Sequence, residues 1–325
     1  MKNKLLFSIV IPCYNVEQYV DKAIQSCLCQ QGIDSSEFEI IAINDGSKDG
    51  TLQKLNNYID YNNITILSQD NSGLSVTRNR GVRIARGEYV LFLDGDDWFS
   101  RNALSVLKKN LNSADLVIFP MEFYFSETIQ KNASLGLNSG QLYTAKEILR
   151  ETIGKSQFQS CPAPTKCYKT SLFQEKGLHF ISGILHEDGP FYLETLYNVS
   201  AIRYIEEYIY HYRQQRIGSI TTQKRTWINA EGVFKGNERI LSLYGYKNKD
   251  VNYYFLATSI MQLFQSYENE AEADKVVRYM STKSFRVFLL RVLMYFRFNL
   301  RTFLSGIMIL VSPKLSRILY RNKHC

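Results

Sequence analysis

Between residue 5 and about residue 97, short apolar runs alternate with stretches of helical periodicity. The apolar runs are Phe7 to Ile11, Glu39 to Asn44, Ile64 to Ser68 and Tyr89 to Asp94. The helical stretches between them are Val16 to Gln30, Thr51 to Asp60 and Val76 to Ala85. Strands that alternate with helices form βαβ units, because a parallel connection needs a crossover. The pattern therefore predicts an α/β fold with a mainly parallel sheet flanked by helices.

The composition is that of a globular protein, with 45% of the 325 residues hydrophobic and 22% charged. None of the six cysteines stands in a CxxC doublet or at zinc spacing from a histidine. A disulfide scaffold and a zinc module are therefore excluded. We interpret the cysteines as buried or free thiols in a reducing compartment, which predicts a cytoplasmic protein.

The N-terminus imitates a secretory signal, because Lys2 and Lys4 precede an apolar run that stops at Pro12. No small-residue cleavage site follows this run. Its β-branched residues Ile9, Val10 and Ile11 favour a buried strand of a parallel sheet instead.

Beyond Asp97 the alternation becomes looser. We predict a helix near Ser100 to Leu111 and a strand at Asp115 to Phe119. A loop or hairpin tip is predicted at 126–140. Helical patterns are predicted on both sides of residues 161–164, and a helical stretch at 226–282. The predicted boundaries are 1–115 and 116–225 for two halves of one domain, 226–282 for a helical C-terminal extension, and 283–325 for a tail.

The net charge of +8 is a property of the C-terminal end. No acidic residue follows Asp274, whereas 11 lysines and arginines do; the remaining chain has 28 basic and 31 acidic residues. A nucleic-acid-binding protein would spread its cations over the folded surface that meets phosphate. The charge distribution therefore argues against nucleic acid as a partner.

Residues 283–304 have the pattern of an amphipathic helix. At about 100° per residue, one arc of about 60° holds Lys283, Arg286, Arg297 and Arg301. The opposite arc holds Phe285, Phe288, Leu289, Val292, Phe296, Leu300 and Phe303. The uncharged stretch Thr302 to Pro313 has 12 residues, fewer than the roughly 20 that a membrane span needs. We predict peripheral contact with an anionic membrane surface; the alternative is a packing helix with a solvated basic face.

The sequence Asp94-Gly95-Asp96-Asp97 places three carboxylates at the end of an apolar strand. Ligands of parallel sheets bind outside the carboxyl ends of the strands. Clustered carboxylates repel one another unless a cation compensates them, and hard oxygen ligands suit Mg²⁺ or Mn²⁺. The pattern indicates a metal site for phosphate binding, although a solvated acidic turn has the same sequence.

Two further polar segments follow predicted strands. Asp45 ends the second strand, where a carboxylate can accept a hydrogen bond from a pyrimidine or a ribose. Asn71 and Arg78 flank the start of the third helix, and an arginine there can bind a diphosphate with two hydrogen bonds. The alternative is that Ser47, Asp49 and Ser75 only cap helices and that Arg78 is a surface charge.

Four ordered segments in the first 97 residues resemble the inverting family 2 glycosyltransferases of bacterial cell-surface polysaccharide synthesis. They are Ser8-Ile9-Val10-Ile11-Pro12-x-Tyr14-Asn15, Asn44-Asp45-Gly46-Ser47-x-Asp49-Gly50-Thr51, Asn71-x-Gly73-x-Ser75-x-x-Arg78-Asn79-x-Gly81, and Ala85-x-Gly87-Glu88-Tyr89 leading to Leu93-Asp94-x-Asp96-Asp97. The resemblance implies the Rossmann-like GT-A fold. It also implies that residues 1–115 bind a nucleotide sugar and that 116–225 bind the acceptor.

The resemblance implies a role for each matching residue. The donor-binding residues would be Pro12, Tyr14, Asp45, Asn71, Arg78, Asp94, Asp96 and Arg213. Asp94 and Asp96 would form the DxD motif, with Asp96 bound directly to Mn²⁺ or Mg²⁺ and His211 as a further metal ligand. Asp97 would support the ligands without touching the metal.

His186-Glu187-Asp188 resembles the ED motif of the family, whose aspartate is the general base that inversion requires. Glu187 and Lys166 would lie on the acceptor side. The stretch from Tyr212 to Thr221 resembles the family's segment over the diphosphate, where His211 and Arg213 could reach the phosphates or the metal. Without the resemblance, Glu187-Asp188 is equally a plain helix N-terminus, and His211 a strand-end histidine.

The activity that follows is metal-dependent transfer of a sugar, with inversion, from a UDP-sugar to a hydroxyl of a glycan or lipid-linked acceptor. The tail would hold the enzyme at the inner face of the cell membrane. Two alternatives are a sugar-nucleotide pyrophosphorylase and a sugar-nucleotide-binding scaffold subunit without catalysis. The first would need a glycine-rich basic loop after the first strand, where Pro12-Cys13-Tyr14-Asn15 stands instead.

Overall fold

The computed structural model describes residues 4–125, 128–131, 134–153, 161–214, 226–265, 270–295 and 300–321. The chain divides into two compact units. The first unit comprises Met1–Ile148, Gln159–Gly183 and Asn198–Ile217. The second comprises Leu149–Phe158, Ile184–Tyr197 and Gly218–Cys325. The boundaries differ from the predicted ones, because the segment 184–197 groups with the C-terminal helices.

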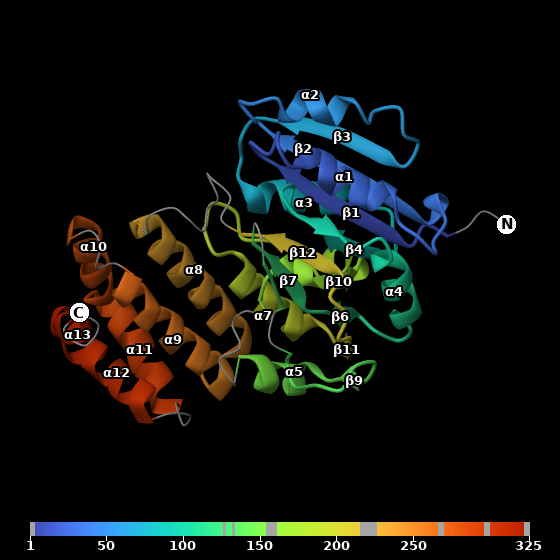
Figure 1. Cartoon of the computed structure of the whole chain (residues 1–325). Helices are drawn as coiled ribbons and strands as arrows, with labels where there is room; N and C mark the ends of the chain where they lie inside the picture. The colour runs from blue at the N-terminus through green and yellow to red at the C-terminus, as the bar shows by residue number, and fades with distance from the viewer. Residues whose placement is uncertain are drawn as a thin grey trace. The chain divides into compact units, whose positions relative to one another are not determined.

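The first unit is built around an eight-stranded mixed sheet (Figure 1). In spatial order its strands are β3 (Ile64–Gln69), β2 (Phe38–Asp45), β1 (Phe7–Cys13), β4 (Tyr89–Phe92), β10 (Lys166–Lys169), β6 (Leu116–Ile118), β11 (Ile202–Tyr204) and β9 (Leu142–Tyr143). The four strands β3, β2, β1 and β4 are parallel, and β10 runs antiparallel to both of its neighbours. The predicted parallel sheet is therefore confirmed for the first 97 residues.

Strand β1 lies in the middle of the parallel part, and all seven of its residues are buried. A strand covered on both faces carries a continuous apolar run, which is why no alternation is visible in its sequence. The helices that connect the strands are α1 (Val20–Leu28), α2 (Thr51–Asn56), α3 (Leu74–Ile84) and α4 (Ala103–Asn110). Gly81 brings α3 close to β1, because a Cβ there would lie 2.3 Å from Val10 Cγ1.

A second, four-stranded sheet has the order β5 (Trp98–Phe99), β12 (Tyr210–Arg213), β7 (Met121–Tyr124) and β8 (Ile129–Lys131). Strands β7 and β8 are antiparallel, so residues 129–131 of the predicted loop or hairpin tip at 126–140 form a strand. Residues 126–127 and 132–133 of that range lie outside the described residues. The central strand β12 is parallel to β7 and antiparallel to β5. This small sheet therefore joins residues 98–99, 121–124, 129–131 and 210–213.

The sequence prediction was wrong after residue 165, where a helical pattern was expected. Residues 166–169 form β10, which pairs with both β4 and β6. A four-residue segment between two strands is stabilised by its neighbours, and local periodicity gives little information about it. Short helices precede and follow this strand: α5 (Ala145–Thr152) and α6 (Ser171–Gln174).

The helical stretch predicted at 226–282 is confirmed, and it continues into the tail. The second unit contains α7 (Asp188–Asn198), α8 (Trp227–Tyr244), α9 (Lys249–Gln265), α10 (Glu270–Met280), α11 (Lys283–Tyr295), α12 (Leu300–Val311) and α13 (Pro313–Arg321). In the described part of the chain, none of the helices combines the length and the apolar character that crossing a membrane requires.

The α11 part of the apolar face predicted for the tail is buried within the second unit, whereas Leu300 of the same predicted face, in α12, is 73% exposed. Phe285, Leu289 and Val292 of α11 are at most 4% exposed. The Phe285 ring lies 5.6 Å from that of Phe234 in α8 and 6.0 Å from that of Phe255 in α9. The α11 part of this face therefore completes a helical core and is not turned toward a membrane. Phe296 and Arg297, which were also assigned to the amphipathic pattern, lie outside the described residues.

Candidate active site in the first unit

The acidic segment forms a turn at the carboxyl end of β4. The Leu93 amide donates to the Val10 carbonyl (3.0 Å), and the Asp97 amide donates to the Asp94 carbonyl (2.9 Å). Gly95 packs on the end of β1, where a Cβ would lie 3.1 Å from the Pro12 carbonyl oxygen. Pro12 therefore lies next to the acidic turn, and the donor contact predicted for it stays a prediction.

Asp94 is paired with a buried arginine. The Arg78 Nη2 atom donates to Asp94 Oδ1 at 2.8 Å, and the guanidinium lies 5.2 Å from the ring centroid of Phe180. The Arg78 side chain is 1% exposed, whereas that of Asp94 is 29% exposed. Arg78 is therefore not a surface charge, and its buried side chain is not open to a diphosphate. It binds one oxygen of the Asp94 carboxylate and leaves the carboxylate accessible to solvent.

Asp97 is buried and tied to strand β12. Its Oδ2 atom accepts a short hydrogen bond from the Tyr210 hydroxyl, and its Oδ1 atom accepts from the Arg213 amide at 2.8 Å. Burial, followed by the charges of Asp96 and Asp94, raises the pKa of Asp97 well above its usual range. The supporting role predicted for Asp97 agrees with this geometry, since the carboxylate points into the protein.

Arg213 lies beside the turn, and the donor contact predicted for it stays a prediction. Its Nε atom donates to the Asp96 carbonyl at 3.0 Å. Its guanidinium lies 4.8 Å from the Tyr19 ring centroid and 5.0 Å from that of Trp98. Gln214 ends the described stretch here, so the predicted segment over the diphosphate, up to Thr221, lies outside the described residues.

Negative charge accumulates around the turn. Burial, followed by the charges of Asp96 and Asp94, raises the pKa of the Cys13 thiol. Burial, followed by the charges of Asp97, Asp94 and Asp96, raises the pKa of Tyr212 to about 12. A divalent cation fits such a donor set of hard carboxylate oxygens. Within the described ranges, no three Asp, Glu, His or Cys side chains converge as a metal site.

Asp45 holds the loop that leads into α3. Its carboxylate accepts from the amides of Ser72 and Gly73, each at 2.9 Å, and from Gln69 Nε2 at 2.7 Å. The Asn71 side chain donates to the Asp45 carbonyl at 3.0 Å. The structure thus brings Asp45 and Asn71 together, and the donor contacts predicted for them stay predictions.

The close approach of this loop depends on one glycine. Gly46 has a φ of +69°, and a Cβ there would lie 2.6 Å from the Asn71 amide nitrogen.

Tyr14, another predicted donor residue, follows β1 and has a 43% exposed side chain. Its exposure leaves it available to a nucleotide base.

His211 occupies the small sheet, where its register neighbours are Trp98 and Glu122. Its Nδ1 atom lies 2.9 Å from Glu122 Oε2 and its Nε2 atom 3.0 Å from Ser100 Oγ. Burial lowers the pKa of His211 despite the neighbouring carboxylate. Both ring nitrogens thus have partners in this conformation, and metal binding by His211 would require it to release one of them.

Lys166 differs from the expectation that it faces an acceptor. The side chain is fully buried, and its Nζ atom donates to the Pro162 carbonyl at 2.7 Å and to Thr165 Oγ1 at 3.0 Å. An ammonium without solvent contact needs such acceptors. Lys166 therefore stabilises the turn before β10.

The ED segment belongs to the second unit, where Asp188 begins α7. His186 has a φ of +64°, and the Phe191 amide donates to the Glu187 carbonyl at 3.0 Å. The helix start is packed tightly, because a Cβ on Gly189 would lie 2.0 Å from the Tyr254 hydroxyl. Glu187 is buried and Asp188 is partly exposed. Of the two carboxylates, Asp188 is the one that solvent reaches.

A comparison with protein families matches residues 8–177, just over half of the chain, to the model of glycosyl transferase family 2. The chain belongs to glycosyl transferase family 2. The uncharacterized glycosyltransferase EpsJ of Bacillus subtilis is a relative, 30% identical over 213 residues, which are 64% of this chain and 61% of EpsJ. The chain thus spans less than two thirds of the length of that relative.

Solved structures support the GT-A fold. The Staphylococcus aureus TarS fragment 1–349, crystallised with UDP-GlcNAc, matches with a TM-score of 0.73 and 19% identity, covering 98% of this chain and 92% of the fragment. The mannosyltransferase PcManGT of Pyrobaculum calidifontis, crystallised with GDP-Man and Mn²⁺, matches with a TM-score of 0.51 and 13% identity, covering 97% and 88%. At these identities the likeness concerns the fold alone.

Three residues of this family 2 site were missed from the sequence. Tyr210 binds Asp97, Trp98 lies against Arg213, and Lys22 Nζ lies 3.2 Å from the Trp98 ring centroid. Trp98 follows the acidic turn directly, which is a signal that could have been used. Tyr210 is 113 residues from Asp97 along the chain, so no local pattern connects them.

We expect Tyr210→Phe to lower the free energy of unfolding by about 1–3 kcal/mol, because it leaves a buried Asp97 oxygen without its donor. Denaturant unfolding measures the change. Tyr61→Phe, at an exposed tyrosine, is the matched control and should change stability by less than about 0.5 kcal/mol. Equal stability of the two variants would contradict the anchoring role of Tyr210.

Proposed function

We propose that this protein transfers a sugar from a nucleotide donor, a UDP-sugar, to a hydroxyl group of a glycan or lipid-linked acceptor, with inversion at the anomeric carbon. Membership of family 2 supports the reaction class. The observation that carries the proposal is the acidic turn at the carboxyl end of β4, where Asp94 is accessible and held by Arg78. Ligands of such sheets bind at this edge.

The donor would lie along the ends of β1, β2 and β4. Tyr14 would contact the base, and Asp45 with Asn71 would shape the wall on which the ribose rests. Arg213 lies beside Asp96 and would contribute a positive charge to the diphosphate. UDP is the proposed nucleotide because the TarS fragment, which shares the fold, was crystallised with UDP-GlcNAc.

Mn²⁺ or Mg²⁺ would be held by Asp96, with Asp94 contacting the ribose or the sugar. When bound, such a cation acts as a Lewis acid that offsets charge growing on the diphosphate oxygens. The residues fit this role because they supply carboxylate oxygens at a turn in which negative charge accumulates. Arg78 keeps the Asp94 carboxylate in place, and Tyr210 does the same for Asp97.

Asp188 would be the general base. Inversion requires that the acceptor hydroxyl loses its proton while its oxygen attacks the anomeric carbon and the bond to UDP breaks. The Asp188 carboxylate accepts that proton, and UDP leaves with the electron pair of the broken bond. Partial exposure of Asp188 at the start of α7 supports this role, whereas buried Glu187 would position the turn.

A thermal-shift panel tests the proposal. Purified protein is heated with UDP, GDP, CMP and dTDP forms of common sugars, each with Mn²⁺ and with a chelator. We expect a metal-dependent shift confined to UDP-sugars, because a ligand at a hundredfold excess over its Kd stabilises the folded state by about 2.7 kcal/mol. If none of the nucleotide sugars causes a thermal shift, the proposed function is overturned and a scaffold subunit is favoured.

A further inference from the structure

Exposed apolar side chains gather on the last three helices. Among the described residues, twenty large hydrophobic side chains are exposed, and eleven of them lie between residues 287 and 319. These eleven are Val287, Leu290, Met294, Tyr295, Leu300, Leu304, Ile307, Val311, Leu315, Ile318 and Leu319. Soluble proteins rarely expose contiguous apolar surface without a binding role.

On α12 these side chains form a single stripe. At about 100° per residue, Leu300, Leu304, Ile307 and Val311 share an arc of about 60°. Leu300 is 73% exposed and Val311 is 70% exposed, whereas Ile309, on the opposite side of the helix, is fully buried. The stripe is therefore an outer face of the helix and not a frayed part of its core.

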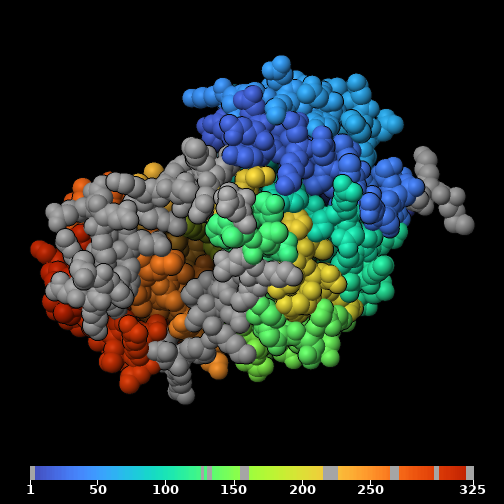
Figure 2. All heavy atoms as spheres, in the orientation of Figure 1, coloured from blue at the N-terminus to red at the C-terminus, as the bar shows by residue number. Residues whose placement is uncertain are grey.

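On α11 a similar stripe has basic margins. Val287, Leu290 and Met294 again fall within an arc of about 60°, and Arg286 and Arg291 lie on its two sides. This stripe is separate from the buried face of Phe285, Leu289 and Val292. Helix α11 packs against α12, and α12 against α13, so the stripes lie on one group of packed helices. Its atoms, red in Figure 2, form part of the surface of this unit.

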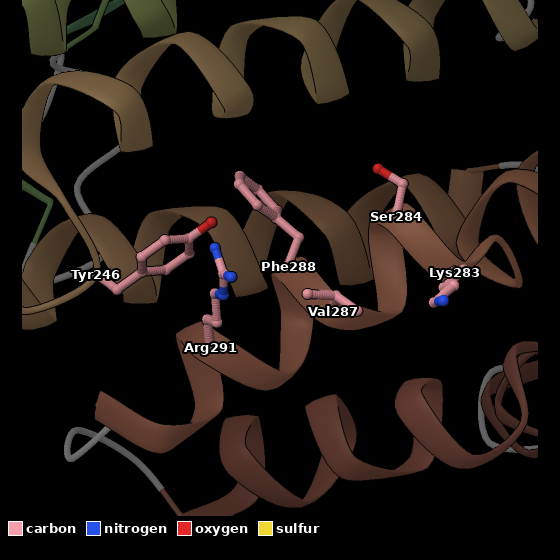
Figure 3. Close-up of a pocket in the computed structure, with 6 residues that line it drawn as sticks. All are labelled: Tyr246, Lys283, Ser284, Val287, Phe288 and Arg291. Carbon is pink, nitrogen blue, oxygen red and sulfur yellow. The ribbon is translucent and has the colours of Figure 1, made fainter.

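A pocket of about 480 Å³ adjoins the α11 stripe and is lined by Tyr246, Lys283, Ser284, Val287, Phe288 and Arg291. Val287 belongs to both the pocket and the stripe. Figure 3 shows the Tyr246 ring next to the Arg291 guanidinium, with a distance of 5.8 Å from Cζ to the ring centroid. Lys283 and Arg291 place two cations in the lining, and each can pair with a phosphate group.

We propose that the outer face of α11, α12 and α13 docks on an anionic lipid bilayer. The apolar stripes would enter the boundary between headgroups and acyl chains, and Arg286, Arg291 and Lys283 would meet lipid phosphates. The helices have 13, 12 and 9 residues, which suits helices that lie on a membrane. The proposal concerns attachment and does not depend on the transfer reaction.

Charge decides between a bilayer and a second copy of this chain. The sequence has no acidic residue after Asp274 and 11 basic ones. Two copies meeting through this face would bring like charges together, whereas an anionic bilayer neutralises them. An acidic protein surface is the remaining occupant, and the experiment below separates it from lipid.

The test is co-sedimentation of the full chain with phosphatidylglycerol-rich vesicles and with pure phosphatidylcholine vesicles. Wild type is expected to bind the first and not the second. The double variant R286E/R291E should bind about 30-fold more weakly, since each cation near an anionic surface contributes about fivefold. L304E/V311E should lose at least about tenfold through apolar burial. Deleting the tail is unsuitable, because α11 completes the helical core.

Matched controls make the same changes elsewhere in the second unit. I228E/M261E alters two exposed apolar residues of α8 and α9, and K235E/K249E reverses two charges there. Both controls should bind vesicles like wild type. The proposal is overturned if wild type does not bind anionic vesicles. It is also overturned if the control variants weaken binding as much as the stripe variants do. An unchanged donor-induced thermal shift in the stripe variants keeps this result separate from the proposed function.

Discussion

Replacing Asp188 by asparagine is expected to lower the rate of sugar transfer by about 10²- to 10⁴-fold, the usual contribution of a general base. Asparagine has nearly the same shape but cannot accept the proton of the acceptor hydroxyl. The proposed donor-binding residues all belong to the first unit, so the thermal shift caused by a UDP-sugar should stay at the wild-type value. Transfer is measured as release of UDP in the presence of acceptor.

Asp250→Asn is the matched control for this variant. Asp250 also lies in the first turn of a helix of the second unit, so both substitutions remove a favourable charge from a helix N-terminus. That loss is worth up to about 2 kcal/mol of stability at Asp250, which is 7% exposed, and should not change the transfer rate. If Asp188→Asn keeps full activity, or if Asp250→Asn loses as much, Asp188 is not the base.

Asp96→Asn is expected to abolish the metal-dependent part of donor affinity. Loss of a residue that merely supports a metal ligand costs about 10- to 100-fold in affinity, and loss of a ligand should cost at least as much. Titration with the UDP-sugar, with and without chelator, measures the effect. Wild type should lose affinity when the chelator is added, whereas the variant should bind equally weakly in both conditions.

The folded state of the Asp96 variant should be as stable as wild type or slightly more so. Asp96 repels the buried carboxylate of Asp97, and asparagine removes that repulsion. Asp70→Asn removes one charge from an exposed position after β3 and should leave metal-dependent affinity unchanged. Metal-dependent donor binding that survives in Asp96→Asn would exclude Asp96 as the ligand.

The first four strands could be predicted because their signals are local. Each is an apolar run between helical stretches, and the observed bounds of β1, β2 and β3 agree with the predicted ones to within two residues. Strand β4 ends at Phe92, two residues early, because Asp94 turns away to meet Arg78. Strand β10 could not be predicted, since four residues carry too little periodicity and pairing with β4 and β6 stabilises them.

The amphipathic pattern of the tail was visible in the sequence. A helical pattern does not reveal whether the apolar face meets lipid or protein. Phe285 meets Phe234 and Phe255, residues that are 51 and 30 positions away in the chain. The exposed stripe of Leu300, Leu304 and their neighbours became visible only when the buried face was known.

The sequence by itself determined the fold class, the family and the residues of the acidic turn, because strand periodicity and motif spacing are properties of neighbouring residues. The tertiary structure alone decided what those residues contact. It buried Arg78 behind Asp94, tied Asp97 to Tyr210 and engaged both nitrogens of His211. Burial and pairing depend on residues brought together from distant parts of the chain, and no local pattern encodes these contacts.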